Sequence, residues 1–338
     1  MRDERNHSLL AHNTFGINVR CNRFLEYDTV REAQEVASLL REAQEAFMTI
    51  GSGSNLLLTQ DFQGTVVHAN VKGITLTEHH GEAIVRCGSG ERWDDVVRWT
   101  VEQGFTSLAC LSIIPGETGA AAVQNIGAYG SEAAQFIDHL LAVEIATGRQ
   151  VRISAAECRY GYRDSRFKHE WKNRYLITHV ALRLQRSAMP SLDYGNIRQE
   201  LERRALPHPT AQELRQTIID IRRSKLPDPE EDVGNAGSFF MNPVVDKALY
   251  TSLLQRHPQM PHYPIDEQHE KIPAAWLIDQ CGWKGRSLGP AGVWAKQALV
   301  LVNLGGATGP DIVALCQAIQ KDVKDRFGIE LEPEVNIV

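Results

Sequence analysis

The chain has 338 residues, with 36 Lys and Arg against 42 Asp and Glu, so its formal net charge is −6. This length excludes a peptide-sized or disulfide-stapled scaffold and predicts two or three domains. The mild acidity argues against a nucleic-acid-binding surface over the whole protein. A hydrophobic content of 43% with 23% charged residues excludes a disordered chain.

The sequence gives no targeting or membrane signal. The apolar residues near the N-terminus, Leu9, Leu10 and Ala11, are too few for a signal peptide, and no stretch approaches the ~18 apolar residues of a membrane span. The six cysteines lack the Cys-x-x-Cys spacing of a zinc or redox site, which is typical of reduced, buried thiols. We therefore expect a cytoplasmic protein with no bound metal and no membrane insertion.

The first part of the chain predicts a small α/β unit that ends near residue 70. A helix over 29–45 has Val30, Val36, Leu39 and Leu40 on one face, and a short buried strand over 47–50 follows it. A loop over 51–55, called the Gly/Ser loop below, then leads to strands over 56–58 and 64–67 of the same unit.

The next part predicts a sheet with covering helices. A strand over 83–87 precedes an amphipathic helix over 93–104 that ends at Gly104. The remaining elements are strands over 140–145 and 150–153, joined as a hairpin across Thr147-Gly148, a helix that starts with a capping box at Ser154, and a strand over 175–184.

The last third begins with a loop-rich insertion over 186–209. A helix over 210–225 follows, and the prolines at 227 and 229 make the best linker candidate of the chain. Beyond this linker we expect helices near 246–256, 272–281 and 310–327, a strand over 298–302 and a terminal strand.

Two blocks of small residues indicate ligand binding. The sequence Gly51-Ser52-Gly53-Ser54-Asn55 follows a strand, so its backbone N–H groups can surround a diphosphate, although an ordinary tight turn is the simpler interpretation of this loop taken alone. The block over 114–130 is rich in Gly and Ala and lets a flat ligand lie on the backbone, or lets a helix pack tightly. Together they favour a dinucleotide-like cofactor.

Three further segments carry groups suited to catalysis. The segment over 160–168 contains Arg163, which can pair with a substrate carboxylate or with a nearby Asp. Ser238 lies among small and aromatic residues without a visible Ser-His-Asp partner set, and a capped turn beside a core strand is its plain interpretation. Glu330, Glu332 and Glu334 alternate with apolar residues and share one face of an extended strand, usually a solvated one.

The ordered motifs GSGSN, IPG, QNIGAYG, YGYRDSRFK, KLPDP, NAGSFFMNP, WLIDQCGWKG, QALVLVN and LEPEV resemble those of the UDP-N-acetylenolpyruvoylglucosamine reductase (MurB) family over the whole chain. The insertion around Tyr194 is similar to that of its type I members. The resemblance implies an α+β protein whose FAD-binding portion, of the vanillyl-alcohol-oxidase (PCMH) type, extends from about Phe15 to Arg186. A smaller α+β substrate domain follows. The implied domains are 1–70 and 71–226 for FAD, joined by a C-terminal strand over 329–338, and 227–328 for the substrate.

The resemblance also implies non-covalent FAD and assigns its binding residues. The diphosphate would be bound by Gly51, Gly53, Ser54 and Asn55. The adenine, ribitol and ring regions would be lined by Pro115, Gly116, Gly119, Gln124, Asn125 and Gly127.

In the reaction that the resemblance implies, NADPH reduces FAD, and flavin N5 gives hydride to the vinyl carbon of UDP-N-acetylglucosamine enolpyruvate, forming UDP-N-acetylmuramate for peptidoglycan. Arg163 would stabilise the developing negative charge, Glu334 would hold a proton or orient Arg163, and Ser238 would protonate the adjacent carbon. The residues implied in substrate binding are Tyr194, Lys225, Asn242 and Gln297, and Lys225 also suits the NADPH phosphates.

Two positions depart from the family pattern: Met241 stands where lysine is expected, and Asn336 stands where arginine is expected. Two alternatives remain beside the reductase. One is a related FAD-dependent oxidase of an alcohol or sugar lactone, although no histidine lies within 51–55 to hold a covalent flavin. The other is a non-catalytic nucleotide-sugar or flavin-binding protein. For the reductase we expect a monomer that binds small molecules and no nucleic acid, with roles in cell-wall biogenesis, cell shape and division.

Overall fold

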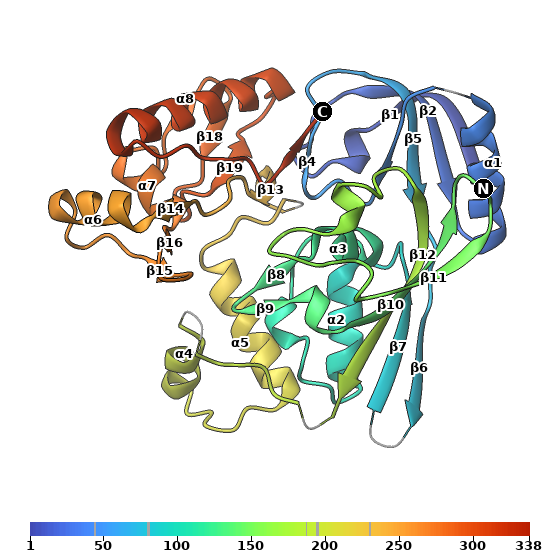
Figure 1. The fold of residues 1–338 in the computed structure, drawn as a ribbon, viewed down its shortest axis with the longest axis horizontal. Helices are drawn as coiled ribbons and strands as arrows, with labels where there is room; N and C mark the ends of the chain where they lie inside the picture. Colours follow the sequence, from blue (N-terminus) through green and yellow to red (C-terminus); the bar gives the residue numbers. More distant parts are fainter. Residues whose placement is uncertain (44, 80–81, 187, 194–195, 230) are drawn as a thin grey trace. The chain divides into compact units, whose positions relative to one another are not determined.

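The helices and strands follow the hydrophobic pattern of the sequence over most of the chain (Figure 1). The computed structural model describes residues 1–43, 45–79, 82–186, 188–193, 196–229 and 231–338. It divides into two compact units. Unit 1 comprises Met1–His7, Cys21–Ser52 and Phe62–Arg222, and unit 2 comprises Ser8–Arg20, Gly53–Asp61 and Arg223–Val338.

A four-stranded sheet in the order β1-β2-β5-β3 forms one part of unit 1. The helix α1 connects the end of β2 to the start of β3, so these two strands run in the same direction. Both pair in parallel with β5. The apolar face of α1 packs on Leu25 and Val67, so the predicted helix and the strands at 47–50 and 64–67 are confirmed. The bounds are β1 Arg2–Ser8, β2 Arg20–Tyr27, α1 Val30–Ala43, β3 Phe47–Ile50 and β5 Phe62–Ala69.

The prediction that residues 56–58 form a strand of the same small α/β unit is wrong. Leu56–Leu57 (β4) pairs in parallel with Asn336–Ile337 (β20), which is the predicted terminal strand. Both strands belong to unit 2, and two backbone hydrogen bonds of 3.1 Å and 2.9 Å, from Asn336 N to Asn55 O and from Val338 N to Leu57 O, hold them together. The chain therefore leaves the first sheet at the Gly/Ser loop.

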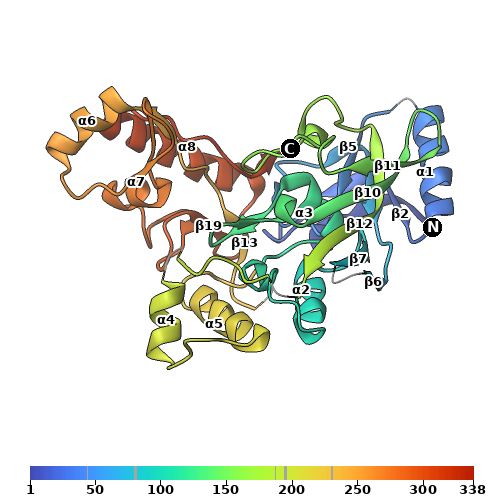
Figure 2. The same cartoon turned by 60° about the horizontal axis from the view of Figure 1, so that its bottom comes forward.

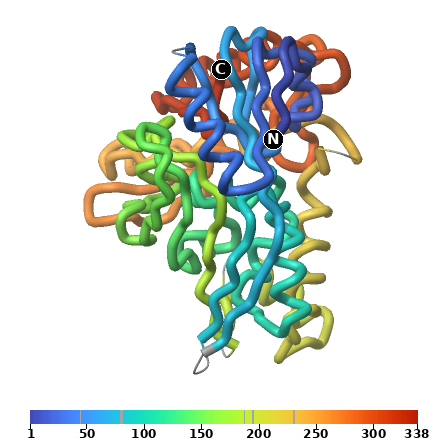
Figure 3. The backbone as a smooth tube through the Cα atoms, turned by 90° about the vertical axis from the view of Figure 1, so that its right-hand side faces the viewer, coloured from blue at the N-terminus to red at the C-terminus, as the bar shows by residue number. Residues whose placement is uncertain are grey.

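An antiparallel sheet in the order β11-β10-β12-β7-β6 forms the second part of unit 1, with α2 and α3 beside it (Figure 2). Leu140, Val180 and Val85 alternate onto the face that packs against Trp93 and Ala121. Figure 3 traces β6 and β7 side by side. The bounds are β6 Ile74–His79, β7 Glu82–Gly88, α2 Trp93–Glu102, α3 Thr118–Gln124, β10 Ile137–Glu144, β11 Gln150–Ser154 and β12 Tyr175–Gln185.

These bounds confirm the predicted hairpin and the strands over 83–87 and 175–184. One neighbouring prediction is wrong. The capping bonds of Ser154 form, since its Oγ donates to Glu157 Oε2 at 2.6 Å, but the residues that follow make a turn, with no helix there. The insertion over 186–209, predicted as loop-rich, also contains the short helix α4, Ile197–Arg203, because Ile197 and Leu201 find an apolar partner surface on α5, Ala211–Arg223.

Unit 2 holds the sheet β13-β19-β18-β17, a smaller sheet β14-β16-β15, and three helices. The predicted helices are confirmed: α6 Lys247–Arg256, α7 Ala274–Gln280 and α8 Gly309–Phe327. A capping box between Thr308 and Asp311 begins α8, and Gly328, with φ of +69°, ends it. The strands are β13 Gly234–Ser238, β14 Val244–Asp246, β15 Tyr263–Pro264, β16 His269–Lys271, β17 Ser287–Leu288, β18 Ala291–Val293 and β19 Val300–Asn303.

The minor elements of the chain are short. Within the described ranges, no helix is long and apolar enough to cross a membrane. The minor elements are the strands β8 Gly127–Ala128 and β9 Ser131–Glu132, and the 3-10 helices Leu10–His12, Ala109–Leu111, Ala133–Gln135 and Arg166–Lys168.

One ion pair fixes α5 on α2, and its removal is testable. Asp94 accepts two hydrogen bonds of 2.7 Å from Arg215 and one of 2.6 Å from the amide of Ile113. We expect Asp94→Ala to lower the free energy of unfolding by about 1–3 kcal/mol at neutral pH, measured by urea denaturation. Asp325→Ala, which removes an exposed pair with Lys321, should cause no measurable change.

The effect should depend on pH. Burial alone would raise the pKa of Asp94, but the hydrogen bonds from Arg215 and Ile113 hold it below its ordinary value. The carboxylate therefore contributes stability above the pKa of an unfolded Asp, and this contribution is lost as the pH falls through the lower pKa of the folded state. A difference between wild type and Asp94→Ala that grows toward acid would contradict this account.

Candidate functional site

The two small-residue blocks of the sequence meet in unit 1. A Cβ placed on Gly51 would lie 3.0 Å from Cβ of Ala120 and 3.2 Å from Oε2 of Glu117. Gly51 immediately follows β3, and Ala120 lies in the first half of α3. The two blocks are therefore close enough to bind one cofactor together. The binding roles of their residues stay a prediction.

Small side chains also allow α3 to approach the loop after β7. A Cβ on Gly119 would lie 2.9 Å from Cβ of Ser89, so only glycine permits this approach. Gly116 precedes the helix with φ of +124°, a backbone conformation that favours glycine, and Pro115 before it is exposed. Tight helix packing, the simpler interpretation of this block, thus explains Gly119 without a ligand.

Unpartnered polar atoms near these blocks fit a bound cofactor. Oε1 of Gln124, at the end of α3, is buried without a hydrogen-bond partner, and so are Oγ of Ser52 in the Gly/Ser loop and Oγ of Ser89. A buried polar atom without a partner costs about 1–3 kcal/mol. A ligand with many hydrogen-bonding groups, such as FAD, would satisfy such atoms, so the residues present fit this group.

The second half of the Gly/Ser loop belongs to unit 2. Gly53 has φ of +72°, and a Cβ on it would lie 2.1 Å from the carbonyl oxygen of His12. The fold alone therefore requires glycine at this position, whether or not a ligand binds there. Asn55 is held by the C-terminal segment: its Nδ2 donates to the carbonyl of Glu334 at 3.2 Å, and its own carbonyl accepts from Asn336. Ser54 between them is half-buried.

Arg163 is held by the loop that follows α3. Its Nη2 donates to the carbonyl of Gly127 at 2.5 Å and its Nη1 to that of Asn125 at 3.4 Å. In return, Nδ2 of Asn125 donates to the carbonyl of Gly161 at 2.7 Å. Arg163 has φ of +53°, and its guanidinium lies 5.2 Å from the ring centre of Tyr162. The structure thus joins the QNIGAYG and YGYRDSRFK segments, and Arg163 hydrogen-bonds to backbone carbonyls there.

A second guanidinium, that of Arg222, lies near Arg163, and it was not among the predicted site residues. Arg222, at the end of α5, interacts electrostatically with Tyr129 and is repelled by the positive charge of Arg163. Its Nε is buried without a partner. Burial is the main cause that lowers the pKa of Arg222. The sequence offered one weak signal, an arginine just before the KLPDP motif, but its nearness to Arg163 depends on the fold.

In unit 2, the strand that carries Ser238 lies beside the C-terminal segment. The amide of Glu334 donates to the carbonyl of Phe239 at 2.8 Å, and Phe240 bridges Pro333. Ser238 is exposed, and Glu334 is half-buried. The backbone thus brings the C-terminal segment of Glu334 alongside the residues that follow Ser238.

Three predicted substrate residues of unit 2 have structural contacts. Asn242 Oδ1 accepts from the amide of Ala274 at 2.9 Å, at the start of α7. Gln297 Oε1 accepts from Leu299 at 3.3 Å, just before β19, where Val300 pairs with Ser238. Lys225 has an exposed side chain, and its carbonyl accepts from Trp294 Nε1 at 3.1 Å. Tyr194 lies outside the described residues.

The two departures from the family pattern both contact the backbone of unit 2. The backbone amide of Met241 donates to the carbonyl of Glu332 at 2.9 Å. Asn336 donates to the carbonyl of Asn55 through both its backbone amide and its Nδ2, each at 3.1 Å. Asn336 therefore anchors the Gly/Ser loop with a neutral side chain.

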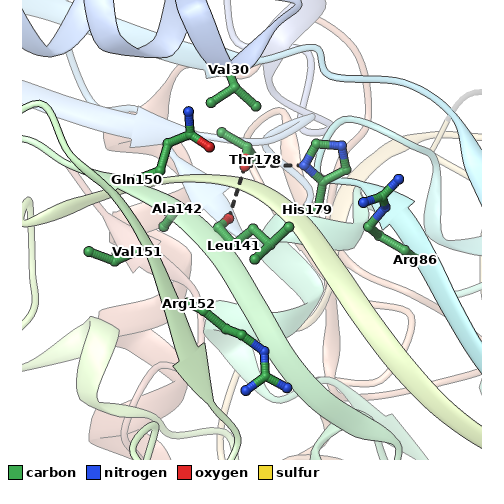
Figure 4. Close-up of a pocket in the computed structure, with 9 residues that line it drawn as sticks. All are labelled: Val30, Arg86, Leu141, Ala142, Gln150, Val151, Arg152, Thr178 and His179. Atoms are coloured by element: carbon green, nitrogen blue, oxygen red, sulfur yellow. Dashed lines mark hydrogen bonds between the residues drawn. The ribbon is translucent and has the colours of Figure 1, made fainter.

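A hollow in unit 1 lies apart from these residues (Figure 4). Leu141 pairs with Arg152 and His179, and these side chains lie on the sheet face opposite to Leu140 and Val180. Arg152 donates to Asp138 at 3.2 Å, so part of the positive charge is already neutralised. The lining residues are Val30, Arg86, Leu141, Ala142, Gln150, Val151, Arg152, Thr178 and His179, none of them a predicted site residue.

Comparisons with known proteins agree with this geometry. The FAD binding domain family matches residues 22–154, and the family described as UDP-N-acetylenolpyruvoylglucosamine reductase, C-terminal domain, matches residues 228–338. A UDP-N-acetylenolpyruvoylglucosamine reductase of Bacteroides fragilis is 47% identical over 336 residues, covering 99% of this chain and 100% of its own length. One of Burkholderia multivorans is 46% identical over 331 residues, covering 97% and 95%.

A crystal structure of UDP-N-acetylenolpyruvylglucosamine reductase (MurB) from Thermus caldophilus has the same fold. It matches 100% of this chain and 99% of its own, with a TM-score of 0.68 at 20% identity. The predicted α+β fold with an FAD-binding portion is thus confirmed.

An FAD binding domain joined to a reductase C-terminal domain defines a flavin-dependent oxidoreductase. With relatives of this identity along its whole length, the chain belongs to the UDP-N-acetylenolpyruvoylglucosamine reductase (MurB) family.

The position of Arg163 depends on a glycine, and this is testable. A Cβ on Gly127 would lie 2.6 Å from the carbonyl oxygen of Ser131 and 2.8 Å from Nη1 of Arg163. We expect Gly127→Ala to displace Arg163 and to destabilise the protein by about 1–3 kcal/mol, measured by thermal unfolding and by crystallography. Gly161→Ala is the matched control, because its Cβ would lie 3.6 Å from Asp164 Cβ. Equal melting temperatures for the two variants would contradict the constraint.

Proposed function

We propose that Arg163, Ser238 and Glu334 carry the reduction of UDP-N-acetylglucosamine enolpyruvate to UDP-N-acetylmuramate by NADPH in this chain. The observation that carries this proposal is the concentration of positive charge at Arg163. Two backbone carbonyls fix its guanidinium, and Arg222 with its unpartnered Nε lies near it. Such a pair of cations suits a substrate that has a carboxylate and a diphosphate.

FAD, when bound, would accept hydride from NADPH and deliver it to the vinyl carbon of the substrate. Negative charge then develops on the adjacent carbon and its carboxylate. Arg163 stabilises this charge, and because its position is set before the reaction, little reorganisation is needed at that step. Its left-handed backbone conformation is part of this fixed geometry.

Ser238 acts as the general acid that gives a proton to the adjacent carbon. A serine hydroxyl is a weak acid, so its local field and its position have to compensate. Glu334 supports the carboxylate end of the substrate, either by holding a proton against it or by orienting Arg163. The hydrogen bond between Glu334 N and Phe239 O supports the choice of Glu334, because it places this residue beside the strand end of Ser238.

FAD is held without a covalent bond by both small-residue blocks. Its diphosphate is bound at Gly51, Gly53, Ser54 and Asn55, which lie at and beyond the end of β3. The remaining contacts come from the loop before α3, from α3 itself and from the turn after it, and Oε1 of Gln124 supplies a buried acceptor. These remaining residues are Pro115, Gly116, Gly119, Gln124, Asn125 and Gly127.

The UDP-sugar is bound by Tyr194, Lys225, Asn242 and Gln297, to which we add Arg222. Lys225 also binds the phosphates of NADPH, which occupies the site before the sugar. The functional domains are 1–70 and 71–226 for FAD, joined by 329–338, and 227–328 for the substrate. The protein acts as a cytoplasmic monomer in peptidoglycan synthesis, with consequences for cell shape and division.

The role of Ser238 is tested by separating the two half-reactions in a stopped-flow instrument. We expect Ser238→Ala to leave reduction of the flavin by NADPH nearly intact and to slow its reoxidation by the enolpyruvyl substrate by about 100-fold or more. Ser252→Ala, an exposed serine on α6, is the matched control and should change neither rate. Equal slowing of both half-reactions in Ser238→Ala would refute a role as acid.

The role of Arg222 is tested by steady-state kinetics. Arg222→Met keeps a long side chain but removes the charge, and we expect it to raise the KM for the UDP-sugar by about tenfold, since a hydrogen bond to a charged group contributes about 1.5–3 kcal/mol. The neighbouring exposed Arg223 provides the control variant Arg223→Met, which should leave KM unchanged. If both variants behave alike, Arg222 does not bind the substrate.

A further inference from the structure

A buried cluster of charged groups lies beside the Gly/Ser loop in unit 1. His68, on β5, stands between two carboxylates: its Nδ1 lies 2.7 Å from Oε2 of Glu26, and its Nε2 lies 3.1 Å from each oxygen of Glu117. His68 and Glu117 are buried, and Glu26 is half-buried. A neutral imidazole has only one N–H donor, whereas an imidazolium has two. The two carboxylate contacts therefore favour the charged form.

Some of the surroundings of His68 favour its protonated form, and others oppose it. Burial opposes the imidazolium, but hydrogen bonds with Glu117 and Glu26, and their negative charges, outweigh it, so the pKa of His68 is raised. On β1 and β2, the ring of Phe24 lies between the rings of His7 and His68. Two further titratable groups act on its partners: Arg2 interacts with Glu26, and Tyr27 with Glu117.

Glu117 connects this cluster to the Gly/Ser loop. It is the residue immediately before α3, and its Oε2 lies 3.2 Å from the position of a Cβ on Gly51. A carboxylate at this place would repel an anionic group bound at the loop, and the repulsion is strong where water is excluded. A cation within hydrogen-bond distance of Glu117 removes most of this repulsion, and His68 is such a cation when protonated.

We propose that His68 is a positioning residue that neutralises Glu117 and thereby allows the loop at Gly51 to hold the diphosphate of FAD, so that retention of FAD weakens as the pH rises. This inference rests on the proposed function only for the place of the diphosphate. A group whose pKa is raised by folding contributes its stabilisation below the pKa of the unfolded chain and loses it as the pH rises through the folded pKa. FAD retention should likewise be strongest at low pH and weaken as the pH rises.

The test is the release of FAD from the holoenzyme after dilution, followed by the rise of flavin fluorescence between about pH 6 and about pH 9. For the wild type we expect slow release at low pH, release that becomes faster as the pH rises through the His68 titration, and a constant fast rate above it. His68→Gln should release FAD rapidly at every pH. His179→Gln, a histidine on the outer face of β12, is the matched control and should follow the wild type.

A variant with the opposite effect separates this role from simple structural damage. Glu117→Gln removes the repulsive charge, so it should keep FAD release slow at high pH. The titration of His68 itself, followed by NMR of histidine-labelled protein, should move to lower pH in Glu117→Gln. Release from the wild type that does not change with pH, or a Glu117→Gln variant that loses FAD as fast as His68→Gln, would overturn the role of His68. It would leave the flavin assignment standing, whereas a wild type that never takes up FAD would overturn both.

Discussion

The buried amide of Asn125 is the interaction on which the geometry of unit 1 depends. Its Nδ2 donates to Glu132 at 2.9 Å and to the carbonyl of Gly161 at 2.7 Å, while its Oδ1 accepts from the amide of Ala134 at 2.9 Å. Its φ of +46° lies in the left-handed region that asparagine tolerates better than most residues. One side chain thus ends α3 and fixes the loop of Arg163, and each bond left unmade would cost about 1–3 kcal/mol.

Unit 1 contains two clusters of charged residues that differ in their net charge. Near the Gly/Ser loop, two carboxylates and a histidine form a cluster in which the charge on His68 offsets that on Glu117. Near Arg163, positive charge is concentrated, and burial makes the charge on Arg222 costly without an anionic partner. On the functions that we propose, the first region positions a loop and the second attracts an anionic substrate.

The parts of the fold that sequence patterns predicted are those with a local cause. The apolar period of α1, the turn at Thr147-Gly148 and the capping box of α8 each act within a few residues, and the structure has these elements. The errors arise where a distant partner decides. Leu56–Leu57 pairs with residues 280 positions later, at β20, and α4 exists because α5 offers it an apolar surface. The capping box at Ser154 is followed only by a turn, although Ala155 and Cys158 pack against the core.

The same distinction holds for the candidate site. Motif order found Gly51, Gln124 and Arg163, and the structure adds their contacts without testing their roles. Arg222 and His68 were missed, because each matters only through neighbours on other elements. For His68 a signal existed: a histidine that follows Val66 and Val67 on a buried strand needs partners for its ring nitrogens.

The most direct test of the account is the visible spectrum of the purified protein under anaerobic conditions. We predict that the protein is yellow, that NADPH bleaches its flavin band, and that UDP-N-acetylglucosamine enolpyruvate then restores the band without oxygen. Restoration by oxygen alone would contradict the reductase account and favour an oxidase, and a colourless protein that cannot take up FAD would contradict a flavin-dependent function altogether.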